Sequence, residues 1–110
     1  MTAAPTLAAR GQIWWANVGL PENKRFVIVS NNVRNAKLND VLGARLTTAD
    51  KPDIPSIVRF VPGEVSEARC CVIADDIVPL FKRDLVQTIG ALTPGQMSRV
   101  DEALKAALDL

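Results

Sequence analysis

Up to residue 92 the chain is interrupted at short intervals by Gly, Pro and Asn, and only the stretch after it has helical periodicity. The runs between the interruptions are rich in apolar and β-branched residues, which favour strands. With 110 residues the chain can bury one hydrophobic core. The pattern predicts a mainly β fold, a small curled antiparallel barrel with one C-terminal α-helix. We expect strands over 12–18, 26–29, 40–48, 56–61, 69–74 and 86–92, with Asp75-Asp76 ending the fifth and a helical turn over 79–85.

The C-terminal stretch opens with the residues of a helix start. Thr93 and Gln96 have the spacing of a capping box, and Pro94 stands at the first helical position. Apolar residues then recur at intervals of three and four, which predicts about four turns of amphipathic helix. We expect the helix to pack on the sheet through one apolar stripe, formed by Met97, Val100, Leu104, Ala107 and Leu108.

Two expected strands near the middle of the chain are joined by a polar loop and carry cations and hydroxyls. Side chains two residues apart on a strand share a face, so Arg45 and Thr47 are expected to point the same way. Lys24 and Arg25 stand where the preceding strand begins. A group of this kind suits an anionic ligand.

The net charge of +1 identifies no partner, but the charges are unevenly distributed. Residues 24–51 contain six cations and two acids, whereas residues 52–110 contain six cations and nine acids. A positive field concentrated in one region attracts a polyanion such as nucleic acid. The alternative is a basic loop that only faces solvent.

Several classes of function are excluded or disfavoured by what the sequence lacks. It contains no His, which excludes His-based catalysis and His-ligated metal, and we expect neither a metal nor a cofactor. Cys70 and Cys71 are adjacent, and we expect two small, buried, reduced side chains. No run approaches the roughly 20 apolar residues that span a bilayer. Residues 1–9 do not resemble a signal peptide, so we expect a flexible tail, a single domain over residues 10–110 and a cytoplasmic protein.

Five short motifs occur in a fixed order from about Arg10 to Leu110. Together they resemble the MazF/PemK family of toxins, the endoribonucleases of type II toxin–antitoxin pairs. No single motif is specific, but their order and spacing are. The matching segments are RGQIWW at 10–15, FVIVSNN at 26–32, RLTT at 45–48, ADDI at 74–77 and IGAL at 89–92, followed by the helix.

The resemblance implies an SH3-like barrel of the MazF/PemK/CcdB type that forms a homodimer and is bound by a cognate antitoxin. It also implies cleavage of single-stranded RNA (mRNA, tRNA or rRNA) without a metal. The family's catalytic Thr falls on Thr47, with Thr48 as its neighbour. The family's catalytic Arg falls on Lys24 when counted back from Ser30 without a gap, or on Arg25 after a slip of one residue.

These residues can support attack of the ribose 2′-hydroxyl on the adjacent phosphorus. We expect Lys24 and Arg25 to divide the work, one moving a proton and the other holding the phosphate, while Thr47 orients it. Around them, Arg34, Arg45 and Lys51 are candidate phosphate contacts. Asn31 and Asn32 could read base edges, and Trp14 could stack on a base. The structural alternatives are that the Asn residues form a turn, that Arg45 pairs with an acid and that Trp14 only packs.

Two other functions fit the same fold. One is a DNA gyrase poison of the CcdB type, whose contact depends on a C-terminal Trp-Gly-Ile, whereas this chain ends in Ala-Leu-Asp-Leu. The other is a non-catalytic nucleic-acid-binding module of the SH3-like class. Incubation with RNA in EDTA distinguishes the endoribonuclease from both.

Overall fold

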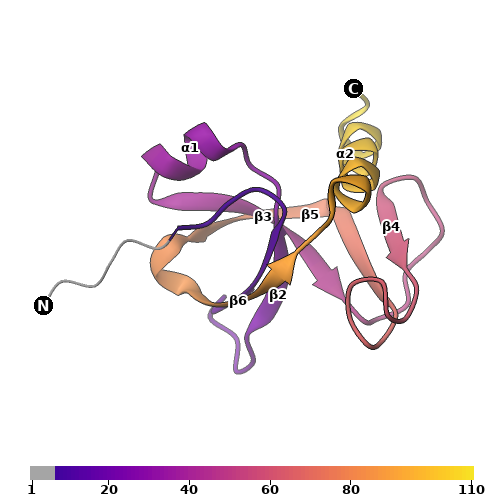
Figure 1. Ribbon diagram of the computed structural model, residues 1–110, viewed down its shortest axis with the longest axis horizontal. Helices are drawn as coiled ribbons and strands as arrows, with labels where there is room; N and C mark the ends of the chain where they lie inside the picture. Colours follow the sequence, from indigo (N-terminus) through magenta and orange to yellow (C-terminus); the bar gives the residue numbers. More distant parts are fainter. Residues whose placement is uncertain (1–6) are drawn as a thin grey trace, which may run out of the picture.

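A curled, six-stranded antiparallel sheet organises the computed structural model, which describes residues 7–110 (Figure 1). The sheet has the order β4-β5-β3-β2-β1-β6 and is not closed, so β4 and β6 are its edges. The predicted mainly β, barrel-like fold with a C-terminal helix is therefore confirmed. The strands are β1 (Gln12–Ala16), β2 (Lys24–Ile28), β3 (Asp40–Thr47), β4 (Ile57–Phe60), β5 (Cys70–Phe81) and β6 (Leu85–Ala91), and the helices are α1 (Asn32–Lys37), the 3-10 turn η1 (Lys82–Asp84) and α2 (Pro94–Leu108).

Strand β5 does not end at Asp75-Asp76, so that prediction was wrong. Arg45 of β3 pairs with Ile73, whereas the preceding Ala44 pairs with Ile77, which leaves residues 74–76 as a bulge within one strand. A bulge lets polar side chains leave the ladder and bends the strand at the same time. The two halves of β5 therefore follow different parts of the curled sheet, and the predicted helical turn over 79–85 shortens to η1.

The polar loop between β2 and β3 contains a helix that the sequence analysis did not anticipate. Asn31 caps α1, because its side chain accepts a hydrogen bond from the Arg34 backbone N–H at 2.9 Å. Asn35 is buried at the same turn and donates to the Ser30 carbonyl at 2.9 Å. The first strand also ends at Ala16, two residues earlier than predicted.

The main hydrophobic core lies between the sheet and α2. The capping box of Thr93 and Gln96 forms as predicted, and Met97 and Val100 are buried. Ala103 completes the buried stripe, while Leu108, which we expected to be part of it, is 61% exposed. Figure 1 shows α2 standing beside β4 and β5 at one end of the sheet.

A second, smaller core covers the other face of the sheet and is centred on β2, β3 and β5. Its buried members are Ala16, Phe26, Ile28, Val41, Leu80 and Leu85. Three residues of β3 point to this face, namely Val41, Arg45 and Thr47. The face is therefore apolar at the Val41 end and polar at the Thr47 end. This division allows a cleft to form beside a packed floor.

Gly43 is closely packed against two residues of the second core, Phe26 and Leu80. A Cβ at this position would come within 2.6 Å of Leu80 Cδ1 and 2.9 Å of Phe26 Cβ. We therefore expect Gly43→Ala to lower the free energy of unfolding by about 1–3 kcal/mol, measured by urea denaturation. Gly95→Ala is the matched control, because no atom lies within 4 Å of its added Cβ. A Gly43→Ala protein as stable as the control would contradict this account.

The ends of the chain bear on two further expectations. Of the predicted flexible tail over 1–9, residues 1–6 lie outside the described residues, and the Ala9 backbone N–H donates to Gln12 Oε1 at 2.8 Å. Across residues 7–110, no helix is both long enough and apolar enough to cross a bilayer.

Candidate functional site

The pairing of β2 with β3 brings three of the predicted site residues to one face of the sheet. Phe26 pairs with Arg45 and Arg25 with Leu46, so one further step places Lys24 opposite Thr47. Paired residues point to the same side of a sheet, as do residues two apart on a strand. Lys24, Arg45 and Thr47 therefore lie on the face of the second core, at its polar end.

Arg25 points to the opposite face from Lys24. It pairs with Trp15 of β1, and its guanidinium carbon lies 5.5 Å from the centroid of the Trp15 ring. Neighbours in a strand alternate sides, so the structure does not bring Lys24 and Arg25 together on one ligand. Trp14, in contrast, shares the face of Lys24, packs against the second core and donates through Nε1 to Gln12 Oε1 at 2.9 Å.

Lys24 and Thr47 both have polar groups available to a ligand. The Lys24 ammonium is 3.9 Å from Glu22, whose side chain is 86% exposed, so this ion pair is weak and solvated. Thr47 Oγ1 accepts a hydrogen bond from the Ala49 backbone N–H at 3.1 Å. An acceptor bond leaves the hydroxyl hydrogen free to donate, and this bond fixes where the oxygen sits.

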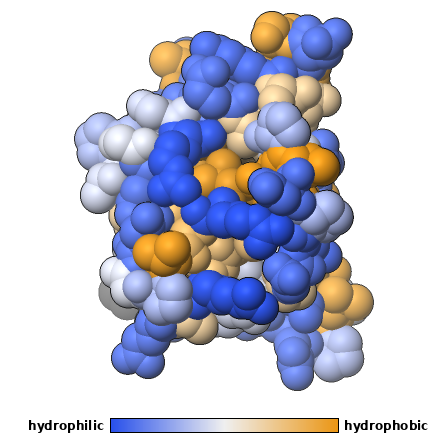
Figure 2. Space-filling view, turned by 90° about the vertical axis from the view of Figure 1, so that its right-hand side faces the viewer, coloured by the Kyte–Doolittle hydropathy of each residue, from blue (hydrophilic) through white to orange (hydrophobic). Residues whose placement is uncertain are grey.

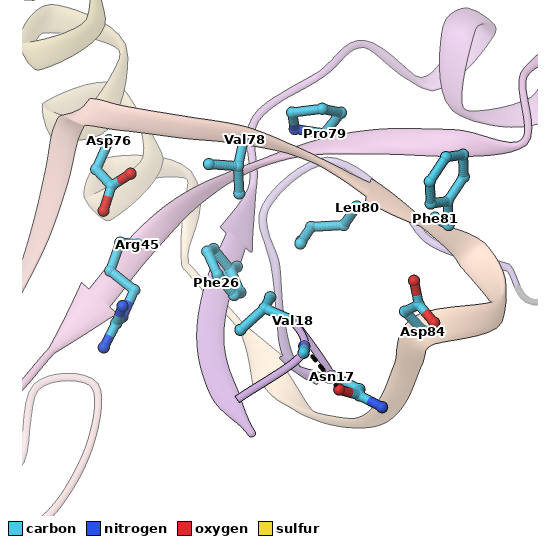
Figure 3. A pocket seen from close by; sticks show the side chains of 11 residues that line it. Asn17, Val18, Phe26, Arg45, Asp76, Val78, Pro79, Leu80, Phe81 and Asp84 are labelled. Atoms are coloured by element: carbon cyan, nitrogen blue, oxygen red, sulfur yellow. Dashed lines mark hydrogen bonds between the residues drawn. The ribbon is translucent and has the colours of Figure 1, made fainter. Parts of the chain in front are cut away.

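A cleft of about 570 Å³ opens on the same face, next to Arg45 (Figure 3). Its floor is apolar, and its polar side chains come from the β1–β2 loop, β3, the bulge of β5 and η1. No ion pair involves Arg45 within residues 7–110, and its buried Nε has no hydrogen-bond partner there. The lining residues are Asn17, Val18, Gly19, Phe26, Arg45, Asp76, Val78, Pro79, Leu80, Phe81 and Asp84.

The remaining predicted RNA contacts are occupied by the fold or lie away from the cleft. Arg34 forms an ion pair with Asp40 at 2.8 Å. Asn31 caps α1, and Asn32 Oδ1 accepts from the Arg10 backbone N–H at 2.8 Å. Lys51 is half-buried in the loop after β3, where its carbonyl accepts from Arg59.

Thr48 lines a second cavity, of about 230 Å³, between the loop after β3 and strand β4. Asp50 and Arg59 form an ion pair at its rim, at 3.2 Å. A hydrogen bond from Arg59, aided by the charge of Arg69, lowers the pKa of the Asp50 carboxyl. Figure 2, a view of the end that carries α2 and β4, shows hydrophilic side chains framing a hollow with apolar residues at its base.

The expectation for the cysteines is confirmed, because Cys70 and Cys71 are both buried free thiols. Burial raises the pKa of Cys70, so its thiol is protonated near neutral pH. Among residues 7–110 no group of three or more Cys, Asp or Glu side chains is placed to hold a metal ion.

Sequence reasoning missed three polar residues of the cleft, Asn17, Asp76 and Asp84. Asn17 comes from the β1–β2 loop, far along the chain from Asp76 in the bulge of β5 and Asp84 in η1. For Asp76 the sequence signals are its place in the ADDI segment and the polar pair predicted to end a strand, and neither indicates a cleft. No local sequence signal indicates that these residues share a cavity with Arg45.

Comparisons with known proteins agree on one family. Residues 9–108 match the family described as the PemK-like, MazF-like toxin of type II toxin–antitoxin systems. The chain is 38% identical over 101 residues to endoribonuclease MazF1 of Mycobacterium bovis and to endoribonuclease MazF4 of Mycobacterium tuberculosis, with 92% of both chains covered in each case.

Solved structures give the same result. A mycobacterial endoribonuclease in complex with its cognate antitoxin has a TM-score of 0.83 and 37% identity, covering 94% of this chain and 96% of that one. The MazF of a Deinococcus radiodurans MazE–MazF complex shares the fold at a TM-score of 0.77, with 16% identity and coverage of 94% and 97%. The chain therefore belongs to the family of PemK-like and MazF-like toxins of type II toxin–antitoxin systems.

Proposed function

We propose that this chain is an endoribonuclease that cleaves single-stranded RNA at short sequences. The observation that carries the proposal is the placement of Lys24, Arg45 and Thr47 on one face of the sheet, beside a cleft with an apolar floor. Membership in a toxin family whose curated members include endoribonucleases supports it. A groove with cations along its rim and apolar surface at its base suits a single strand, because phosphates and bases need different contacts.

In the proposed reaction the ribose 2′-oxygen attacks the adjacent phosphorus and the bond from phosphorus to the 5′-oxygen breaks. The products are a 2′,3′-cyclic phosphate and a free 5′-hydroxyl, and the proton lost by the 2′-hydroxyl is balanced by the one gained at the 5′-oxygen. The Lys24 ammonium lies against the non-bridging oxygens, where charge develops, and the Thr47 hydroxyl donates to the same oxygens. Lys24 and Thr47 are therefore the proposed catalytic pair. Arg25, on the other face, is the residue to test against Lys24.

The reaction uses only groups of the protein and the RNA, so we propose that it needs no metal. Purified protein should cleave RNA at an unchanged rate in about 5 mM EDTA, which is enough to chelate divalent metal ions. End mapping of the fragments should find 2′,3′-cyclic phosphates and 5′-hydroxyls. Loss of cleavage on chelation, restored by added Mg²⁺, would contradict a metal-free reaction.

The proposed partners are single-stranded cellular RNA and a cognate antitoxin, in the cytoplasm where such RNA is found. The comparison structure that contains its own antitoxin supports the antitoxin as a partner class.

We also propose a homodimer, since Val86 and Ile89 are exposed on the edge strand β6. Analytical ultracentrifugation tests the dimer. The gyrase-poison and non-catalytic alternatives predict intact RNA in the EDTA assay.

A further inference from the structure

The cleft beside Arg45 has an electrostatic character that the proposed function does not explain. Asp76 and Asp84 both line it, although the neighbouring end of the same face carries Lys24 and Thr47. Lys24 does not line the cleft, and a phosphate that entered the cleft itself would be repelled by the two carboxylates, so the interior of the cleft disfavours the RNA backbone. A neutral group with hydrogen-bond donors meets no such penalty.

The walls of the cleft suit a flat, partly apolar group. Phe26 is 3% exposed and forms part of the floor with Val78 and Leu80, while Val18 of the β1–β2 loop faces them (Figure 3). A volume of about 570 Å³ is within the ordinary range for small-ligand sites. A nucleobase turned out of a single strand is a ligand of this kind, since apolar and aromatic surfaces accept its faces.

The polar groups at one end of the cleft define which base edge fits. The side chains of Arg45 on β3 and Asp76 on β5 project from neighbouring strands at the same end of the cleft (Figure 3). No ion pair joins them. Arg45 presents only donors, and its buried Nε has no partner within residues 7–110. Asp76 presents two acceptor oxygens and is exposed to the cleft.

We propose that this cleft is a guanine-binding subsite and that Arg45 and Asp76 determine its specificity. Along its Watson–Crick edge guanine has the acceptor O6 followed by two donors, N1–H and the N2 amino group. Asp76 accepts from both donors and Arg45 donates to O6, a charge-assisted arrangement that gives O6, N1–H and the N2 amino group each a partner. Adenine, cytosine and uracil each lack a pair of adjacent donors on this edge. The inference rests on the proposed function, because it assumes that RNA lies along this face.

The test uses base analogues in an RNA made uncleavable by 2′-deoxy substitution at the scissile nucleotide. End mapping of cleaved RNA first locates the guanine nearest the cleavage site. Replacing that guanine by inosine removes only the N2 amino group and should weaken binding about tenfold, whereas 7-deazaguanine, which keeps the whole Watson–Crick edge, should bind as guanine does. In Asp76→Asn the preference for guanine over inosine should fall below about threefold.

Asp53→Asn is the matched control, since this exposed aspartate lies in the loop after β3 and lines neither cavity. It should retain the full preference, and circular dichroism should show that both variants are folded. RNA cleaved without a guanine preference, or a preference unchanged in Asp76→Asn, would overturn the guanine subsite and leave the endoribonuclease proposal standing. If RNA is not cleaved, the RNA sequences that bind are selected from a random pool instead. A guanine preference in that selection would overturn the endoribonuclease proposal alone. No preference would overturn both the endoribonuclease and the guanine subsite.

Discussion

Lys24→Ala is expected to lower the single-turnover rate of RNA cleavage about 100-fold or more, while RNA binding weakens much less. A factor of 100 corresponds to about 2.7 kcal/mol of transition-state stabilisation, which is typical for removing one group that meets developing charge. Lys24 can have this role because, within residues 7–110, its ammonium forms only a solvated ion pair with Glu22, and the strand register places it opposite Thr47 on the same face. Quenched-flow cleavage of a short RNA under saturating enzyme gives the rate directly.

Two matched variants decide which cation acts. Arg25→Ala should retain at least about a tenth of the wild-type rate, because its side chain stacks on Trp15 on the far face. Lys37→Ala removes an exposed cation of α1 and should leave the rate unchanged. If Arg25→Ala loses as much activity as Lys24→Ala, then both cations reach the phosphate and the assignment drawn from the strand register is wrong. If neither variant loses activity, the catalytic cation lies elsewhere.

Phe60→Ala is expected to lower the free energy of unfolding by about 3–5 kcal/mol. Phe60 is 1% exposed in the core between the sheet and α2, and its ring also lies 4.8 Å from the guanidinium carbon of Arg99. Truncation removes the buried ring, leaves a cavity that neighbouring strands cannot close and ends the contact with Arg99. A small domain has about 5–15 kcal/mol of stability in total, so much of it would be lost.

Phe81→Ala provides the control for this prediction. The Phe81 side chain is 49% exposed at the end of β5, so its truncation should cost less than about 1 kcal/mol. Urea denaturation followed by tryptophan fluorescence measures both variants. Equal losses for the two substitutions would mean that the core under α2 does not carry the stability of this fold.

The helix and the strands were predictable because their signals are local. The capping box of Thr93 and Gln96 and the apolar spacing after it act within one segment, and α2 forms where they indicate. The β-branched runs likewise identified six strands, since alternation and burial are properties of neighbouring residues. Errors occurred where tertiary pairing overrode local signals, as at Asp75-Asp76, whose polarity indicated a strand end but whose backbone forms a bulge.

By itself the sequence determined the fold class, the absence of His chemistry and the alternation that places Arg45 and Thr47 on one side of β3. Only the tertiary structure decided that Lys24 shares their face and Arg25 does not. That depends on the register between β2 and β3, and the loop and helix over residues 29–39 that join them have no fixed sequence signature. It also decided that Asp76 and Arg45 line one cleft. These two residues meet because β3 pairs with β5 and the bulge at 74–76 directly follows Ile73, the partner of Arg45. Strand pairing of this kind is decided by the whole sheet rather than by any one segment.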